Sequence, residues 1–343
     1  MSKKEKNCAM RKTSIGGQAL MEGIMMRGPQ KSAMAVRRPN GEICFEESEN
    51  PAPKRPGFCK WPIIRGVFGF IDSMVGGYKY LMRSAEIAME EETAEQAPEE
   101  TAPEAETTST EKPKKKEGEI SKGAMTAMTL IATILGVGLA VLLFIFLPTQ
   151  IYSWLKPVLP DWAADNRYLR SVFEGVLKVL LLVAYMALVS LMKDIRRTFM
   201  YHGAEHKTIF CYEQGLPLTV ENVRKQRRFH PRCGTSFLIL MLIVSIVIGL
   251  FIPPAIPGVN EVLYNIIRTA IKLLLIPLTM GVGYELLKLA GRYDNIFTRI
   301  ISAPGMWLQR ITVREPTDDM IECAIKAFVA VLPPEEQTET PEN

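Results

Sequence analysis

Histidine is scarce in this sequence: among 343 residues there are three, and all of them lie between positions 202 and 230. The six cysteines are scattered without the spacing of a disulfide framework, so we expect most of them in a reducing compartment. The charged N-terminus is followed by no apolar core, which argues against a secretory signal peptide. The glycine-rich stretch 14–29 lacks the Gly-Lys-Ser/Thr ending of a phosphate loop, which argues against nucleotide binding there.

Apolar and charged residues are strongly segregated along the chain. Hydrophobic residues make up 48% of the sequence, but they concentrate in windows with few charges, as in membrane proteins with polar segments attached. Four apolar segments are each long enough to cross a hydrocarbon layer: 123–147, 169–192, 236–252 and 262–290. They predict a mainly α-helical, integral membrane fold with about four transmembrane helices in residues 123–292.

Loop charge predicts the orientation of these spans. The segment 193–235, between the second and third spans, is rich in lysine and arginine, and so is the flank before the first span. By the positive-inside rule, we expect a multi-pass protein of the cell membrane with this segment and both termini in the cytoplasm. The lipid bilayer is then the expected partner. Nucleic-acid binding is not expected, because few aromatic residues accompany the basic ones, and the sequence leaves the oligomeric state open.

The remaining segments are polar or amphipathic. Alternating apolar and polar residues on either side of Asn40-Gly41 predict a small N-terminal β-hairpin with a type I′ turn. Apolar faces interrupted by charges predict amphipathic helices lying on the membrane surface or on the protein itself. The expected organisation is a disordered basic tail (1–12), a Gly/Met-rich strand and hairpin segment (13–50), amphipathic helices (60–88), a disordered acidic and basic linker (89–122), C-terminal amphipathic helices (293–332) and a disordered tail (333–343).

The histidines belong to a pattern of metal-ligand residues. His202 and His206 are four positions apart, so on a helix both imidazoles project from one face and can hold one ion. With Glu205 they form His-x-x-Glu-His, the inverted zincin pattern, in which two histidines bind zinc and the glutamate activates a water molecule. His230 and Cys233 follow as a His-x-x-Cys pair that can complete the site.

Three interpretations of this pattern stay open. His-x-x-Glu-His arises by chance fairly often, so the motif by itself can be without a function. A divalent metal, with zinc as the expected ion, can be held by all four of His202, His206, His230 and Cys233 in a closed structural site. An open site with three protein ligands favours catalysis, with Glu205 as the catalytic residue.

Four further polar residues are secondary candidates. Lys207 and Arg232 can stabilise an oxyanion or hold an anionic substrate. Glu285 lies towards the cytoplasmic end of the fourth predicted span, where it can reach the metal or support its ligands. Glu22 belongs to the glycine-rich stretch, which is either a turn-rich strand without a site or a substrate-facing loop.

Ionisable residues also interrupt the predicted spans. Glu174 and Lys178 are four positions apart in the second span, and Arg268 and Lys272 are four apart in the fourth. Charged side chains at membrane depth face a bundle interior or a watery cavity and are functional candidates. The alternative is that they reach the interface from near the helix ends. Transport is disfavoured, because a monomer with four spans and no visible internal repeat does not make a complete secondary transporter.

Six motifs carry a resemblance to a known family. They begin at Ser14, Tyr201, Leu218, His230, Gly283 and Pro304 and read SIGGQALMEG, YHGAEHKT, LTVENVR, HPRCGTSF, GYELL and PGMWLQR. Together they resemble the YqhQ-like family of bacterial and plastid membrane proteins, classed as domain of unknown function 1385. The resemblance covers most of the chain apart from the termini and the acidic linker. It implies a predicted metal-dependent enzyme, and it implies no substrate.

We therefore expect a metal-dependent membrane enzyme, specifically a hydrolase, that acts at the cytoplasmic face on a lipid or a membrane protein. The alternative hypothesis is a non-enzymatic membrane scaffold or assembly factor with a structural zinc site. Inverted zincins take their third ligand from a distant glutamate. This sequence departs from that pattern, because it offers His230 and Cys233 nearby and only Glu285 as a distant candidate.

Overall fold

The computed structural model describes residues 13–50, 55–89, 122–231, 233–253, 255–293 and 295–337. The predicted tail 1–12, nearly all of the predicted linker 89–122 and the end of the predicted tail 333–343 lie outside these ranges. The described chain is mainly helical, with a small antiparallel sheet at its N-terminal end.

The sheet is a four-stranded meander. Each strand is antiparallel to its neighbour in the order β1-β2-β3-β4, and the strands are β1 (Gly16–Leu20), β2 (Gly23–Arg27), β3 (Lys31–Arg37) and β4 (Ile43–Glu49). Strands β3 and β4 form the hairpin that the alternating pattern predicts. The glycine- and methionine-rich stretch before it supplies the two additional strands.

The turn between β3 and β4 is longer than the predicted type I′ turn. The Arg38 N–H donates to the Glu42 carbonyl at 2.9 Å, so the three residues between them form the loop. The last of these, Gly41, has a φ of 89°. This is the left-handed conformation that closes a three-residue loop, and glycine adopts it at no steric cost.

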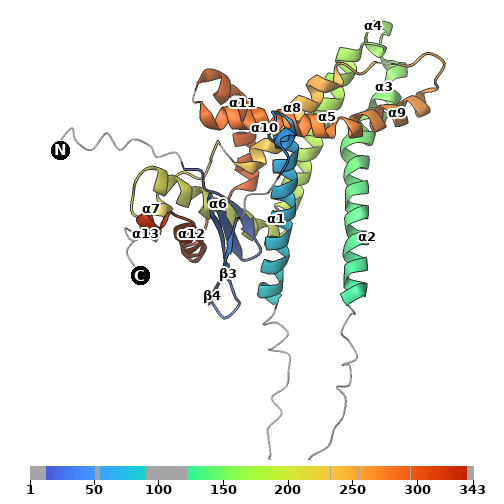
Figure 1. Cartoon of the computed structure of the whole chain (residues 1–343). Helices are drawn as coiled ribbons and strands as arrows, with labels where there is room; N and C mark the ends of the chain where they lie inside the picture. The colour runs from blue at the N-terminus through green and yellow to red at the C-terminus, as the bar shows by residue number, and fades with distance from the viewer. Residues whose placement is uncertain are drawn as a thin grey trace, which may run out of the picture.

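The helices follow the sheet in the sequence. Their bounds are η2 (Gly57–Lys60), α1 (Ile64–Met89), α2 (Lys122–Val141), the π-helical η3 (Leu142–Phe146), α3 (Leu147–Leu155), η4 (Lys156–Val158), α4 (Asp161–Ala164), α5 (Arg167–Val189), α6 (Lys193–Glu213), α7 (Val220–Arg224), α8 (Gly234–Gly249), α9 (Glu261–Leu274), α10 (Ile276–Arg292), α11 (Ile296–Thr312), α12 (Asp318–Ala330) and α13 (Pro334–Gln337). Figure 1 shows the sheet beside α6 and α12, at the end of the molecule away from α3, α4 and α9.

Fewer helices than predicted are long and apolar enough to cross a membrane. Among the described residues, the runs 128–158 and 167–189 meet both conditions, and α9 with α10 would add a third span although the pair is bent by 44°. The proline at position 277, in the first turn of α10, has no N–H to continue the hydrogen bonds of α9. Helix α8 has 16 residues, which rise roughly 24 Å against a hydrocarbon layer of about 30 Å.

Both faces of the sheet are buried. Successive side chains of β3 point to opposite faces, so Ala35 and Val36 lie in different hydrophobic clusters. The first face packs against α6 and α12, where Tyr201 and Phe328 are fully buried. The second face packs against α1 through Ile87. The sheet therefore supports α6, the helix that carries the metal-ligand pattern, from one side.

A close backbone contact holds α6 from another side. The Arg314 N–H, just beyond the end of α11, donates to the Phe199 carbonyl at 2.9 Å. At Gly203, a Cβ atom would lie 1.9 Å from the Arg314 carbonyl oxygen. Only glycine leaves room for this contact, which sets how closely the end of α11 approaches α6.

We expect Gly203→Ala to lower the free energy of unfolding by about 1–3 kcal/mol, the usual cost of overpacking a buried site. The displaced atom is a backbone carbonyl, so no side chain can move aside to make room. The measurement is the melting temperature of the purified full-length protein in detergent. Gly136→Ala is the matched control, because this helical glycine has nothing within 4 Å of an added Cβ. An equal melting temperature for the two variants would contradict the prediction.

Candidate metal centre

Three of the predicted ligands lie together. His202 and His206 project from the same face of α6, with ring centroids 4.4 Å apart. Cys233 approaches them from the start of α8, and its Sγ lies 3.1 Å from the His202 Nε2. Candidate ligand atoms of the three residues all lie within 4.8 Å of one another. We call His202, His206 and Cys233 the metal-ligand group.

Backbone carbonyls orient both imidazoles. The His202 Nδ1 lies 3.0 Å from the Thr312 carbonyl oxygen, and the His206 Nδ1 lies 2.5 Å from the Arg228 carbonyl oxygen. A carbonyl can only accept a hydrogen bond, so each Nδ1 carries the proton and each Nε2 keeps a lone pair. Metal-ligating histidines are commonly oriented by such a bond from the other ring nitrogen.

The Nε2 atom of His206 is buried and has no hydrogen-bond partner among the described residues. Leaving a buried polar atom unpaired costs about 1–3 kcal/mol. Burial also lowers the pKa of His206, which favours the neutral ring that binds metals. A cation shared with His202 and Cys233 would satisfy this nitrogen.

Cys233 is held at the N-terminus of α8. It is the N-cap residue, and its Sγ accepts a hydrogen bond from the Thr235 N–H at 3.4 Å. The exposed N–H groups and the dipole of a helix start favour a negatively charged group at this place. The sulfur is therefore fixed at the start of α8, with its candidate partners His202 and His206 within 4.8 Å.

His230, the other predicted ligand, is directed elsewhere. Its Nε2 lies 3.7 Å from a carboxylate oxygen of Glu213, and its ring packs on Phe210 with centroids 4.6 Å apart. Gln309 of α11 holds its backbone by donating to the His230 carbonyl and accepting from its N–H, both at 2.8 Å. His230 is thus a close neighbour of His206, with centroids 5.7 Å apart, and lies outside the metal-ligand group.

Glu205 faces the sheet from the neighbouring side of α6. Its Oε1 accepts a hydrogen bond from the Gly17 N–H of β1 at 3.1 Å. Burial raises the pKa of Glu205, although His202 and the Gly17 hydrogen bond act in the opposite direction. A Cβ at position 17 would lie 2.9 Å from the Glu205 side chain, so glycine is needed there for the carboxyl to reach the strand.

Lys207 of α6 binds two other segments of the chain. Its buried Nζ donates to the Arg224 carbonyl of α7 at 2.8 Å and also pairs with Glu315 after α11. The ammonium group therefore joins α6 to two other segments. Arg232, the other predicted oxyanion partner, lies outside the described residues.

The two secondary carboxylates each have an arginine partner. Glu22, at the turn between β1 and β2, accepts two hydrogen bonds from Arg197 of α6. Glu285 of α10 accepts two hydrogen bonds from Arg65 of α1. The metal-ligand group includes neither carboxylate. Glu22 fastens the sheet to α6, and Glu285 fastens α10 to α1.

Sequence reasoning missed the groups that orient the ligands. Two of them are the backbone carbonyls of Thr312 and Arg228, and a backbone carbonyl has no signature in the sequence. Gln309 does have one, because it lies in the PGMWLQR motif. Its hydrogen bonds to the backbone of His230 explain why an amide side chain is placed there.

Two comparisons with known proteins found matches. A family model described as "Protein of unknown function (DUF1385)" matches residues 61–334, a range that includes the whole metal-ligand group. The uncharacterized protein YqhQ of Bacillus subtilis (strain 168) is 33% identical over 326 residues, covering 93% of this chain and 92% of that protein. No solved structure matches.

The purified full-length protein should bind one zinc ion per chain, and His206→Ala or Cys233→Ala should abolish this binding, because each removes a member of the metal-ligand group. Elemental analysis after dialysis against a weak chelator measures the metal content. Cys211→Ala is the matched control, since Cys211 is also buried but its Sγ donates to the Pro217 carbonyl. Full zinc content in a correctly folded His206→Ala protein would contradict the assignment.

Proposed function

Since the chain belongs to the family described as a protein of unknown function, DUF1385, we propose its function from its own site: a metal-dependent membrane enzyme, specifically a hydrolase. His202, His206 and Cys233 would hold the metal, and Glu205 would serve as the catalytic residue. A divalent ion there, zinc by its preference for imidazole and thiolate ligands, would supply Lewis-acid polarisation of a substrate oxygen.

The observation that carries this proposal is the geometry around His206. Its Nε2 is buried without a hydrogen-bond partner in the part of the chain that the structure describes, and it belongs to the same small group as the Cys233 sulfur and His202. The Nδ1 atoms of both histidines are bonded to backbone carbonyls. The thiol of Cys233 can donate to the His202 Nε2, but a buried nitrogen without a partner is unfavourable, and a cation shared with His206 would satisfy it, which supports a metal centre over a packed histidine pair.

The number of ligands favours an open site. Structural zinc sites are closed by four protein ligands, whereas catalytic sites use three and leave one position for water or substrate. Here three residues converge, and the nearest fourth candidate, His230, is directed towards Glu213. In an open site the fourth position would be left for water or a substrate.

Glu205 has the properties of a group that transfers protons. It lies between the two histidines in the sequence, and burial raises its pKa. A carboxyl group shifted in this direction exchanges protons more readily near neutral pH than an exposed one does. The Glu205 carboxyl accepts from the Gly17 N–H on the side of α6 that faces the sheet, so for catalysis it would leave that hydrogen bond, take a proton from the attacking water and return it to the leaving group.

The apolar helices support a place at the membrane. The runs 128–158 and 167–189 are long enough to cross it, and the basic segment 193–235 that contains α6 follows the second of them. By the positive-inside rule, α6 and both chain termini would then lie on the cytoplasmic side of a multi-pass protein. The substrate would be a lipid head group or a membrane protein reached at that surface.

A structural zinc site is the second candidate. None of the three ligands lines the cavity beside Gly77 and Arg83 or the cavity beside Lys178 and Lys272, and His206 and Cys233 are buried. A closed centre would fasten α6 to the start of α8 and leave the protein a scaffold or assembly factor. The coordination number decides between the two candidates.

X-ray absorption spectroscopy of the zinc-loaded protein should show one sulfur at about 2.3 Å, two imidazoles at about 2.0–2.1 Å and one further light atom that is not an imidazole. His230→Gln should leave this spectrum unchanged, because His230 points towards Glu213. A third imidazole that is present in the wild type and lost in His230→Gln would establish the closed structural site instead.

Glu205→Gln should keep its zinc and its fold but lose about 100-fold or more of any zinc-dependent hydrolysis, the usual contribution of a general base or acid. The probes are fluorogenic phospholipids in liposomes and a fluorogenic peptide panel, added to reconstituted full-length protein. Glu221→Gln, an exposed pair partner of Lys225, is the control and should retain full activity. Equal rates for all three proteins, or no zinc-dependent rate in the wild type, would favour the scaffold.

A further inference from the structure

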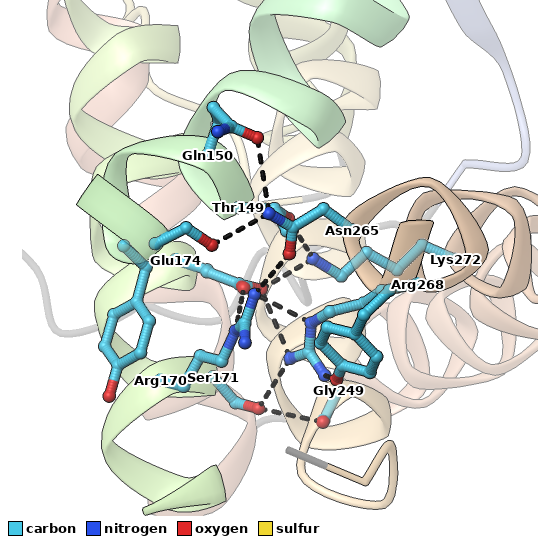
Figure 2. Close-up of polar contacts among 12 residues, drawn as sticks. Thr149, Gln150, Arg170, Ser171, Glu174, Gly249, Asn265, Arg268 and Lys272 are labelled. Atoms are coloured by element: carbon cyan, nitrogen blue, oxygen red, sulfur yellow. Dashed lines mark hydrogen bonds and ion pairs between the residues drawn. The ribbon is translucent and has the colours of Figure 1, made fainter. Parts of the chain in front are cut away.

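A second cluster of ionisable side chains is buried among the apolar helices, away from the metal-ligand group. Arg170, Glu174 and Lys178 lie four positions apart on α5, and Arg268 and Lys272 lie four apart on α9, so each set shares one helix face. All five are buried or nearly so. Figure 2 shows the Glu174 carboxylate at the centre, with Arg170, Arg268 and Lys272 directed towards it. We call these five residues the buried charge cluster.

Glu174 is the only carboxylate of the cluster, and its oxygens are fully used. Oε1 accepts from the Nε atoms of Arg170 at 3.1 Å and Arg268 at 3.2 Å. Oε2 accepts from the Lys272 Nζ at 2.6 Å and the Arg268 Nη2 at 3.3 Å. A carboxylate offers about four lone-pair positions, so no further cation can be accommodated.

Lys178 is the cationic residue of the buried charge cluster that does not pair with Glu174. It is 8% exposed, and it makes no hydrogen bond or ion pair with the described residues. Two neutral groups beside the cluster are already engaged: Asn265 accepts from Arg170 at 2.8 Å, and Thr149 accepts from Lys272 at 2.7 Å. The Lys178 ammonium is therefore buried without a counter-charge of its own.

The cluster carries an excess of positive charge. It holds four cationic side chains and one carboxylate, and the guanidinium groups of Arg170 and Arg268 cannot lose their protons in a protein. Even with both lysines neutral, two guanidinium groups face the single carboxylate of Glu174. No second carboxylate among the described residues pairs with the cluster, and an uncompensated buried charge is strongly unfavourable.

A cavity lies where this partner would fit. Its volume is about 150 Å³, and Lys178 and Lys272 line it. The rest of its lining is mostly apolar and comes from η3, α8 and α10, with Phe144, Met241 and Ile276 among the residues. A cavity of roughly this volume holds a group the size of benzene. It therefore has room for a compact oxyanion and offers apolar walls to whatever carries it.

We propose that the buried charge cluster binds the phosphate-type oxyanion of an amphiphile, with Lys178 and Lys272 contacting the oxyanion and the apolar walls contacting its tail. The anion supplies the negative charge that Glu174 alone does not provide. This site is separate from the metal-ligand group, and its argument does not depend on the proposed hydrolase activity.

The test compares lipids that differ only in charge. Full-length protein in a neutral detergent is titrated with phosphatidic acid, with phosphatidylcholine of the same chains, and with inorganic phosphate, and binding is followed by native mass spectrometry and by the melting temperature. Phosphatidic acid should bind and raise the melting temperature. Lys178→Met, which keeps the length of the side chain and removes its charge, should weaken this binding about tenfold, as expected for one charge-assisted hydrogen bond.

Two variants distinguish binding in the cavity from attraction of the lipid to surface charge. Lys178→Arg keeps the charge and should retain most of the binding. Lys193→Met removes an exposed charge at the start of α6 and should leave the binding unchanged. Binding of inorganic phosphate alone that requires Lys178 would support the anion site with a soluble ligand in place of a lipid. Equal lipid binding by wild type and Lys178→Met, whatever the melting temperature of the variant, would overturn the proposal.

Discussion

The contact between α6 and the backbone at the end of α11 is the constraint on which the candidate centre depends. Gly203 lets the Arg314 carbonyl approach the helix, and the Arg314 N–H bonds to Phe199 one turn earlier. The same approach brings the Thr312 carbonyl to His202. One backbone segment therefore positions the helix and also selects which nitrogen of its first histidine faces the metal-ligand group.

The charged side chains discussed above occur in two kinds of environment. Lys207, Glu22 and Glu285 look like site residues in the sequence, yet each joins two parts of the fold through a hydrogen-bonded ion pair. In the metal-ligand group, the His206 Nε2 has no hydrogen-bond partner among the described residues. In the buried charge cluster, several cations share the single carboxylate of Glu174. A buried polar atom or charge without a partner is costly, so a missing ligand is the simplest physical account at both places.

Much of the fold followed from local patterns. The family resemblance carried by six motifs is confirmed, the hairpin at β3 and β4 forms, and the spacing of His202 and His206 does place both rings on one helix face. The number of spans was less predictable. Hydropathy alone does not show that α8 is short or that α9 and α10 meet at a bend of 44°, because both depend on where the helical hydrogen bonding is interrupted.

The residue types of the centre could be read from local features, because His-x-x-Glu-His lies on one helix and Cys233 follows nearby. Which of these residues meet depends on the tertiary structure. His230 is close in sequence to Cys233, but Gln309 holds its backbone and its ring lies against Phe210, near Glu213. Contacts between distant segments, above all those with backbone carbonyls, depend on packing across the whole fold, and no local pattern records them.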